Sequence, residues 1–485
     1  MTISQRPIIF WLRNDLRLHD QPALAAAAAT GAPVIPLYIL DDDTPGKWKP
    51  GGASRWWLHH SLKRLDESLR KLGSRLVLAR GPAPRVLADL AAEAGAGALF
   101  WSRGYEPWAV KMEQAIHRNL ERAGVRCRRF SGHLLFEPED IRTGSGDPYR
   151  VFTPFYKACL KAAEPALPAP PPTRLPPVPD SIESDRLDSW GLVPSKPDWS
   201  GGIAAAWTPG EAGAQAQLKR FLEEGLAGYA KRRDTPGAEG TSRLSPHLHF
   251  GEISPRQVWH AVNAAAAERD GKADAGAQSF LRELIWREFS HHLLFHWPHL
   301  PDTPLRHAFA RFPWAGGREA FEAWKEGRTG YPIVDAGMRE LWTTGWMHNR
   351  VRMIVASFLV KHLLIPWQEG AAWFWDTLVD ADLANNSASW QWVAGCGSDA
   401  APYFRIFNPV LQGQKFDPQG IYVKAWVPEL AKLPKTRIHA PWEARAADLK
   451  KAKIVLGETY PRPVIDHREA RARALAAYER VKQMG

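Results

Sequence analysis

The chain has 485 residues, of which 45% are hydrophobic and 24% are charged, a composition typical of globular proteins. No apolar run approaches the roughly 18 residues that cross a bilayer, and the first seven residues lack the apolar core of a secretory signal. Basic residues outnumber acidic residues by 63 to 52, which favours a polyanionic partner such as nucleic acid. We therefore expect a monomeric, cytoplasmic protein without a membrane segment.

The first 130 residues alternate short apolar runs with helix-forming stretches. Candidate strands lie at 7–12, 34–40, 75–79, 98–101 and 125–130, and candidate helices at 22–29, 54–72, 85–94 and 108–123. This alternation predicts βαβ units and a doubly wound, mostly parallel sheet. No G-x-G-x-x-G follows a strand, so the usual dinucleotide fingerprint is missing, although the carboxyl edge of such a sheet can still hold a ligand.

A long connector and a helical region follow. Eight prolines fall within residues 165–179, which favours extended chain over helix. Beyond them the pattern is helical, with stretches at 218–226, 255–269, 277–295, 318–325, 334–343, 348–363, 370–378 and 470–482. We therefore predict an α/β domain at 1–130, a Pro-rich connector at 131–202 and an all-α domain at 203–485.

Two polar segments of the helical region could meet phosphates. Thr241 to Ser245 precede a predicted helix, where hydroxyls and free N–H groups can bind an anion. Ordinary capping by Thr241 or Ser242 explains the same pattern. Arg350 and Arg352 begin another helix and face different sides of it, so one can meet a phosphate while the other meets an internal carboxylate.

The segment from Asp380 to Asn386 places two carboxylates and two amides in one short turn. The spacing of a calcium loop is not met, because Ala384 and Asn385 occupy the next ligand positions. Hydrogen bonds to ribityl, ribose or isoalloxazine groups suit this polar density better than a metal ion does. His292 and His296 have metal-compatible spacing but no convincing third ligand, so we expect no metal site.

Several long motifs resemble the photolyase/cryptochrome family. Residues 329–339 (TGYPIVDAGMR) resemble its first signature, and residues 349–361 (NRVRMIVASFLVK), continuing to Trp367-Gln368, resemble its second. Trp390-Gln391-Trp392 and residues 401–409 (APYFRIFNP) fit as well. The likeness extends from the first strand to near the C-terminus, and it is greatest to bacterial photolyases that repair cyclobutane pyrimidine dimers.

The resemblance implies an N-terminal antenna domain and a C-terminal helical domain that holds FAD in a folded, U-shaped form. Asp380 would pair with Arg352, and Asn386 would face the flavin N5, where plant cryptochromes carry an acidic residue. The resemblance places the following residues around the FAD: Tyr229, Thr241, Ser242, Arg243, Leu244, Ser245, Glu283, Arg287, Arg352, Asp380, Ala381, Asp382 and Asn386.

The activity implied by the resemblance is light-driven repair of cyclobutane pyrimidine dimers in DNA. The reduced, anionic FAD would give the dimer one electron and recover it, while the protein binds and orients both partners. The family's electron relay to an oxidised flavin corresponds to Trp314, Trp367 and Trp390. Glu283 and Asn386 would also take part directly in the chemistry.

The dimer must leave the base stack, by the base flipping for which photolyases are themselves a known example. By resemblance, Trp286 and Trp392 line the pocket, Glu283 bonds the pyrimidine edge, and two arginines address the flanking phosphates. The full set of expected DNA and lesion contacts is Arg233, Glu283, Trp286, Asn349, Arg350, Met353 and Trp392.

The residues around His348 bear on the choice of lesion. Relatives that repair (6-4) photoproducts carry paired histidines on this helix, whereas here Asn349 follows His348 and Met353 takes the second position. This favours cyclobutane dimers. A cryptochrome-type blue-light receptor is the alternative, although many such receptors carry a long tail and this chain ends soon after the 470–482 stretch. A flavoprotein that binds nucleic acid without repairing it is a third possibility.

The second chromophore depends on a different segment. One branch of the family binds methenyltetrahydrofolate through an Asn-Glu pair, which is missing from Tyr105-Glu106-Pro107-Trp108-Ala109. We expect methenyltetrahydrofolate in another pose, stacked on an aromatic ring such as Trp108. A deazaflavin, a second flavin and an empty site remain open.

Overall fold

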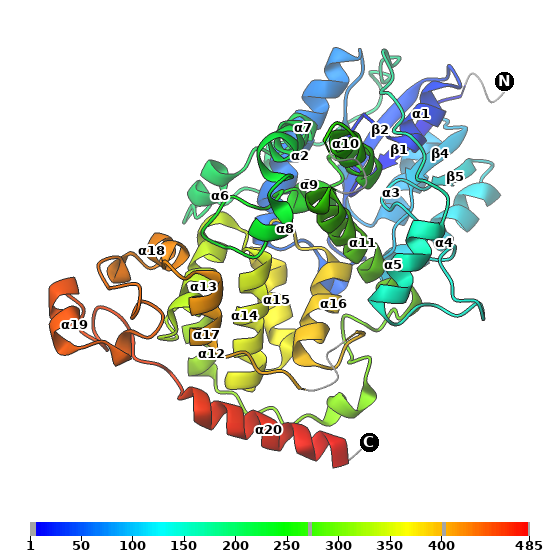
Figure 1. Ribbon diagram of the computed structural model, residues 1–485. Helices are drawn as coiled ribbons and strands as arrows, with labels where there is room; N and C mark the ends of the chain where they lie inside the picture. Colours follow the sequence, from blue (N-terminus) through cyan, green and yellow to red (C-terminus); the bar gives the residue numbers. More distant parts are fainter. Residues whose placement is uncertain (1–5, 270–273, 400–403, 484–485) are drawn as a thin grey trace.

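The computed structural model describes residues 6–269, 274–399 and 404–483, so Ala401, Pro402 and Tyr403 of the last motif lie outside the described residues. Its α/β part contains a five-stranded parallel sheet in the order β3-β2-β1-β4-β5 (Figure 1). The predicted doubly wound sheet is confirmed, with strand ends that differ from the expected ones by no more than two residues. The strands are β1 (Ile8–Leu12), β2 (Val34–Leu40), β3 (Val77–Arg80), β4 (Ala98–Ser102) and β5 (Arg126–Phe130).

The central strands are buried on both faces. Every residue of β1, β2 and β4 is buried, which explains why they form continuous apolar runs without alternation. Successive side chains of β1 point to opposite faces, so Phe10 and Trp11 join different core clusters. The covering helices are α1 (Pro22–Ala28), α2 (Gly52–Lys71), α3 (Ala83–Glu93) and α4 (Pro107–Arg122).

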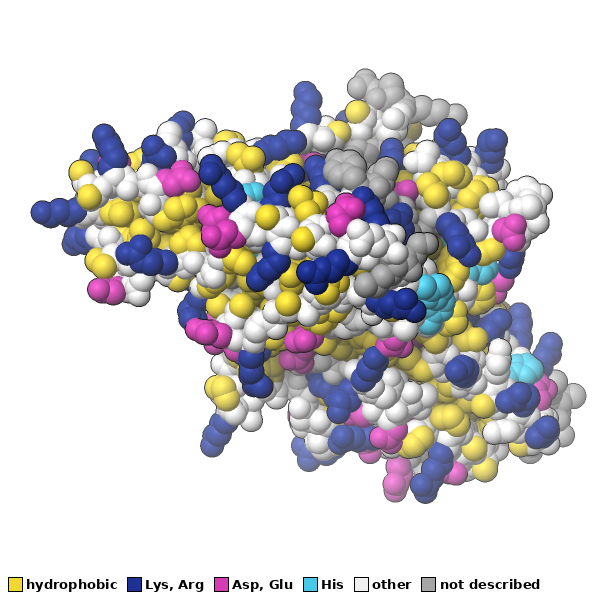
Figure 2. Space-filling view, turned by 90° about the horizontal axis from the view of Figure 1, so that it is seen from below, with side chains coloured by type: hydrophobic (Ala, Val, Ile, Leu, Met, Phe, Trp, Pro, Cys, Tyr) yellow, Lys and Arg dark blue, Asp and Glu magenta, His cyan; other side chains and the backbone are white. Residues whose placement is uncertain are grey.

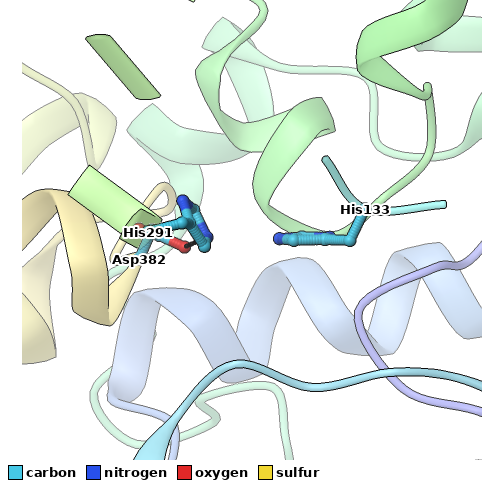
Figure 3. Close-up of side chains that lie close together, drawn as sticks. All are labelled: His133, His291 and Asp382. Atoms are coloured by element: carbon cyan, nitrogen blue, oxygen red, sulfur yellow. Dashed lines mark ion pairs between the residues drawn. The ribbon is translucent and has the colours of Figure 1, made fainter. Parts of the chain in front are cut away.

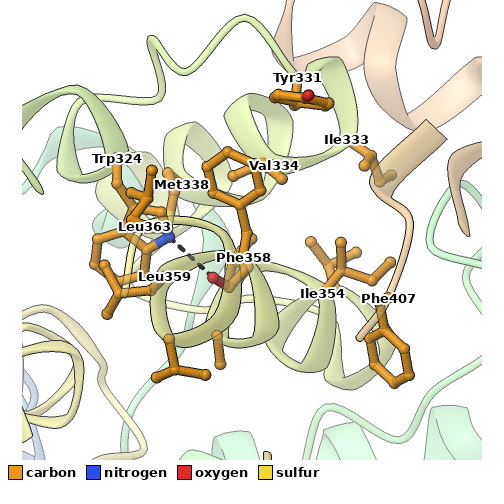
Figure 4. Packing of buried hydrophobic residues seen from close by; sticks show 14 of the residues in the cluster. Trp324, Tyr331, Ile333, Val334, Met338, Ile354, Phe358, Leu359, Leu363 and Phe407 are labelled. Atoms are coloured by element: carbon orange, nitrogen blue, oxygen red, sulfur yellow. Dashed lines mark hydrogen bonds between the residues drawn. The ribbon is translucent and has the colours of Figure 1, made fainter. Parts of the chain in front are cut away.

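The rest of the chain is helical, as predicted, and packs around a second large core (Figure 4). In that core the indole nitrogen of the fully buried Trp324 donates to the Val355 carbonyl at 3.0 Å. Among the described residues, no helix is long and apolar enough to span a membrane. The helices are α7 (Glu211–Arg220), α8 (Tyr229–Arg232), α9 (Ser245–His249), α10 (Pro255–Ala267), α11 (Ala275–His296), α12 (Arg318–Lys325), α13 (Pro332–Thr344), α14 (Asn349–Ser357), α15 (Trp367–Thr377), α16 (Leu383–Ala394), α17 (Pro409–Phe416), α18 (Ile421–Trp426), α19 (Ala446–Ala452) and α20 (His467–Gln483), with π-helical turns at Phe221–Gly225 and Phe358–His362.

Two local predictions need correction. The predicted connector contains helix α5 (Phe152–Lys161) and the first two residues of α6 (Gly201–Ala206), although residues 165–179 form no helix or strand, as expected. Helix α5 was missed although its buried residues Phe152, Phe155 and Cys159 have the i, i+3, i+7 spacing of one helix face, because the Pro-rich stretch after it suggested extended chain. The polar segment 380–386 is not one short turn, because α16 begins within it, at Leu383. The domain bounds at 130 and 202 stay predictions.

The loop after β1 joins the sheet to the helical part. Arg17 is fully buried and donates to the main-chain oxygens of Asp20, Gly132 and Gly251 at 2.9 to 3.2 Å. The buried Asp20 carboxylate accepts two hydrogen bonds from Arg256 at 2.8 and 3.0 Å. Gly251 has a φ of +63°, and a Cβ there would lie 2.1 Å from the Asn14 oxygen, so only glycine allows this approach.

Arg17→Met is expected to lower the free energy of unfolding by at least about 3 kcal/mol, because three buried carbonyls lose their donor. Urea denaturation measures the loss. Arg85→Met is the matched control, since the Arg85 side chain is 82% exposed and its variant should stay within about 0.5 kcal/mol of the parent. Equal stabilities of the two variants would contradict this role for Arg17.

Candidate functional site

A cavity of about 140 Å³ lies at the carboxyl edge of the sheet, where β1 and β4 adjoin. Ligands of doubly wound sheets bind at this point, where the strand order reverses. The helical part closes the cavity, so residues from both halves of the chain line it. Four tryptophans are among the lining residues: Trp11, Trp48, Trp108 and Trp375.

Three titratable side chains lie together beside this cavity, and Figure 3 shows the ring of His133 pointing toward the other two. The ligand atoms of His133, His291 and Asp382 lie within 4.8 Å of one another. However, the Arg287 guanidinium lies 2.8 Å from the His133 ring nitrogen. Burial, and then the Arg287 charge, hold the pKa of His133 well below its usual range. A permanent cation bonded to one of the three groups makes this a hydrogen-bonded network rather than a metal site.

Asp382 is an ionised acceptor at the start of α16. One carboxylate oxygen accepts from the backbone N–H of Asn385 at 2.7 Å, and the other lies 3.4 Å from His291 and 4.0 Å from His249. Burial alone would raise the pKa of Asp382, but His291, its hydrogen bond and the more distant His249 hold it well below the usual range. Asp382 therefore keeps its charge at neutral pH.

Arg352 and Asp380 form the ion pair that the resemblance implies. The guanidinium donates to the two carboxylate oxygens at 2.8 and 3.1 Å, and its Nε donates to the Met347 carbonyl at 2.7 Å. One turn into α16, Asn386 is 9% exposed and donates from its amide to the Ala371 carbonyl at 3.0 Å. These bonds fix the planes of a guanidinium, a carboxylate and an amide.

The Thr241–Ser245 segment leads into α9, whose N-cap is Leu244 with no capping side chain. Neither Thr241 nor Ser242 caps the helix, so the capping explanation for these hydroxyls is wrong. Arg243 has a φ of +51°, and its guanidinium lies 4.9 Å from the Trp346 ring centre. A groove of about 220 Å³ runs beside this segment and is lined by Thr241, Arg243, Glu340, Trp346 and His348, among others.

Helix α11 carries three of the predicted residues on successive turns. Glu283 accepts from Arg233, whose guanidinium lies 5.6 Å from the ring centre of the buried Tyr229. Arg287 lies one turn further along the helix and bonds to His133. Trp286, between them, is partly exposed. The structure thus brings Tyr229, Arg233 and Glu283 together, whereas Arg287 belongs to the histidine network.

Arg350, at the start of α14, pairs with Asp234 at 2.9 Å and donates to the Met353 sulfur at 3.6 Å. The neighbouring Asn349 is exposed. On α16, the partly exposed Trp392 donates from its indole nitrogen to the Asp399 carbonyl at 3.2 Å. Each arginine predicted to meet phosphate, Arg233 and Arg350, therefore already holds a carboxylate.

The three tryptophans predicted to form the relay, Trp314, Trp367 and Trp390, belong to or border one hydrophobic cluster. Trp390 and Trp367 are each 2% exposed, whereas Trp314 is partly exposed. Trp390 packs so closely on α15 that a Cβ at Gly370 would lie 2.2 Å from its ring. The three tryptophans therefore extend from the interior of the protein toward its surface.

Several residues of these sites were not found from the sequence. His133 lies in the connector, where no periodic pattern marked it. His249 and Trp48 likewise belong to no recognised motif, and Trp375 drew notice only for the local density of tryptophans. His291 could have been found, because it lies one turn after Arg287 on a predicted helix.

Comparison with known proteins agrees with this arrangement. A family profile described as "DNA photolyase" matches residues 8–173, and one described as "FAD binding domain of DNA photolyase" matches residues 280–480. A deoxyribodipyrimidine photo-lyase of Agrobacterium fabrum is 51% identical over 100% of both chains. The chain belongs to the photolyase/cryptochrome family.

Its similarity extends to both branches of that family. The crystal structure of a bacterial class III photolyase from Agrobacterium tumefaciens matches with a TM-score of 0.95 and 52% identity, covering 99% of this chain and 98% of the other. Cryptochrome-2 of Arabidopsis thaliana is 39% identical over 100% of this chain and 80% of its own length.

The polar groups of this family member fit an FAD. Among the described residues, the buried Nε2 of His348 and Nδ1 of His249 have no hydrogen-bond partner within the protein. Each lies near predicted FAD residues, since His348 precedes α14 and His249 faces Asp382. Fixed carboxylate, guanidinium and amide groups complete a donor and acceptor set suited to a flavin and its ribityl chain.

The burial of Glu340, which lines the groove, predicts that the stability of the protein depends on pH. Burial raises the pKa of Glu340 to about 7, although the Tyr422 hydroxyl and the backbone N–H of His348 donate to the Glu340 carboxylate. Because the unfolded chain loses this proton near a pKa of about 4.3, stability falls as the pH rises from there toward 7. Glu340→Gln should remove this loss, gaining on the order of 2 kcal/mol over the parent between pH 5 and pH 8.

Urea unfolding of the Glu340 variant and the parent at pH 5, 6, 7 and 8 measures the difference. Glu326→Gln serves as the control, because the Glu326 side chain is 52% exposed. Parallel pH curves for Glu340→Gln and the parent would show that Glu340 ionises normally in the folded protein.

Proposed function

We propose that this member of the photolyase family repairs cyclobutane pyrimidine dimers in DNA, using light and a reduced FAD. The observation that carries this proposal is the pairing of α11 with α16, which pack directly together. Each of these helices bears residues proposed for both partners. Glu283 and Trp286 lie on α11, and Asn386 and Trp392 lie on α16, so flavin and lesion would meet between the same two helices.

The protein's own residues would hold the flavin in one orientation and one charge state. When bound, reduced FAD supplies the electron that opens the cyclobutane ring and accepts it back. The pair of Arg352 and Asp380 offers a fixed charge, and the Asn386 amide presents no ionisable proton where plant cryptochromes have an acid. Trp314, Trp367 and Trp390 would carry electrons inward to an oxidised flavin.

Recognition of the lesion would use the faces of aromatic rings and two arginines that exchange their carboxylate partners for DNA phosphates. Trp286 and Trp392 would stack against the apolar dimer, and Asn349 and Met353 would complete the wall. Arg233 and Arg350 would leave Glu283 and Asp234 for DNA phosphates, which frees Glu283 to bond the pyrimidine edge. Figure 2 shows Lys and Arg side chains spread over one face of the molecule. This agrees with the composition, in which 63 basic residues outnumber 52 acidic residues.

The cavity at the sheet edge is the proposed antenna site. Trp108 lines it, as expected for a stacked folate, and so do Trp48 and Trp375, whose rings meet edge to face at 5.4 Å. Asp382 also lines this cavity, so a chromophore there would lie close to the proposed flavin residues. We therefore propose methenyltetrahydrofolate as the antenna.

The purified protein with reduced FAD is expected to convert thymine dimers in an oligonucleotide to thymines under blue light and not in the dark. Chromatography of the DNA after illumination measures conversion. Full FAD occupancy with no conversion in light would reject repair and favour the cryptochrome-type receptor.

Trp390→Phe is expected to slow photoreduction of oxidised FAD while leaving repair by chemically pre-reduced protein largely intact, because phenylalanine is much harder to oxidise. Absorption changes during illumination follow the photoreduction. Trp259→Phe, a buried tryptophan on α10, is the control. Equal loss of photoreduction and repair would assign Trp390 a structural role only.

Trp375→Leu is expected to lower antenna occupancy without lowering FAD occupancy, because it removes an aromatic wall of the cavity. Absorption spectra and cofactor extraction quantify both chromophores. The control is Trp373→Leu, since Trp373 lies on the same helix and stacks on Trp342 outside the cavity lining. Folate retained at full occupancy in Trp375→Leu would place the antenna elsewhere.

A further inference from the structure

Trp286 and Trp392, the two tryptophans proposed to flank the lesion, are both connected to Asp399, a residue outside the motifs described above. Trp392 donates from its indole nitrogen to the main-chain oxygen of Asp399 at 3.2 Å. The backbone N–H of Phe152 acts on the carboxylate of the same Asp399, lowering its pKa against the larger, raising effect of burial. Asp399 thus bonds through its backbone to one wall of the site, and its side chain acts electrostatically on the start of α5.

Phe152 connects this second interaction to the other tryptophan. Its ring stacks face to face on Trp286, with ring centres 3.5 Å apart and planes 7° apart. Phe152 is 1% exposed, whereas Trp286 is partly exposed. One face of the Trp286 indole is therefore covered by the protein itself, and the ring keeps an accessible side.

The surroundings fix this arrangement further. The Arg282 guanidinium lies 5.4 Å from the centre of the Phe152 ring, and its charge acts on Asp399. Ser398 donates from its hydroxyl to the Arg150 carbonyl, a hydrogen bond between the two segments. Asp399 has a φ of +53°, a left-handed conformation that aspartate tolerates better than most residues.

We propose that Asp399 is a positioning residue that sets the spacing and orientation of Trp286 and Trp392 for lesion binding. Its carbonyl holds Trp392 directly, its carboxylate faces the N–H of Phe152, and Phe152 stacks on Trp286. The connector segment 150–152 thereby becomes part of the lesion site, although it lies more than 100 residues before either tryptophan. This role rests on the proposed repair of dimers.

The test compares Asp399→Gly with Asp399→Asn in the FAD-loaded protein. Glycine accepts the left-handed backbone but removes the side-chain acceptor, whereas asparagine keeps both an acceptor oxygen and the conformation. The readout is the ratio of the Kd for undamaged DNA to the Kd for the same DNA with one thymine dimer. A structural defect would not change this ratio selectively, because phosphate contacts contribute to both constants.

Asp399→Gly is expected to lower the ratio at least about fivefold, through weaker binding of dimer DNA and unchanged binding of undamaged DNA. Asp399→Asn should stay within about twofold of the parent. Phe152→Leu should lower the ratio as Asp399→Gly does. Its control is Phe155→Leu on the same helix, because Phe155 packs on Phe289 and makes no ring contact with Trp286.

Photoreduction of FAD through Trp390 should be unaffected in all four variants, which shows that the flavin site is intact. An Asp399→Gly variant that discriminates as well as the parent would overturn the positioning role, and so would an Asp399→Asn variant as defective as Asp399→Gly. A parent protein with no preference for dimer DNA would instead overturn the proposed function, and this inference with it.

Discussion

The buried guanidinium of Arg17 is the constraint on which the two-part architecture depends. A charge without solvent is costly unless it is hydrogen-bonded, and here the guanidinium donates to carbonyls of the β1 loop, the connector and the helical part. The buried Asp20 adds an ion pair, to Arg256 beyond the connector. Misplacing either half would leave charged groups unpaired. The same loop lines the cavity between the sheet edge and the helical part, through Arg13, Asn14 and Asp15.

Helices α11 and α16 then concentrate the chemistry. Arg287 and His291 of α11, Asp382 at the start of α16 and His133 of the connector form a network, in which Arg287 bonds to His133 and His291 lies 3.4 Å from Asp382. Within it Asp382 remains ionised and His133 remains neutral, so the network offers a fixed pattern of donors and acceptors. The same helices present Trp286 and Trp392 at their accessible sides. One packed pair of helices can therefore set both the electrostatics of a cofactor and the shape of a binding site.

The sequence predicted the parallel sheet and the helical half well, because continuous apolar runs and amphipathic periods directly reflect burial. The pairing of Arg352 with Asp380 came from a motif and agrees with the structure. Contacts between distant segments could not be predicted in this way. The His133 contact to Arg287 and the Phe152 stack on Trp286 join residues far apart in sequence, and neither leaves a periodic signal. Helix α5 is a different case, because its buried residues Phe152, Phe155 and Cys159 do have helical spacing and only the neighbouring prolines pointed to extended chain.

The contact between Gly251 and Asn14 has a consequence for how light would be used. Transfer of excitation between two pigments depends steeply on their separation and on the mutual angle of their transition dipoles. A main-chain contact too tight for any Cβ holds the loop after β1 against the chain just beyond α9, where Gly251 lies. Pigments in the two sites would then keep a constant geometry, and the efficiency of light collection would be set by the folded chain rather than by its thermal motion.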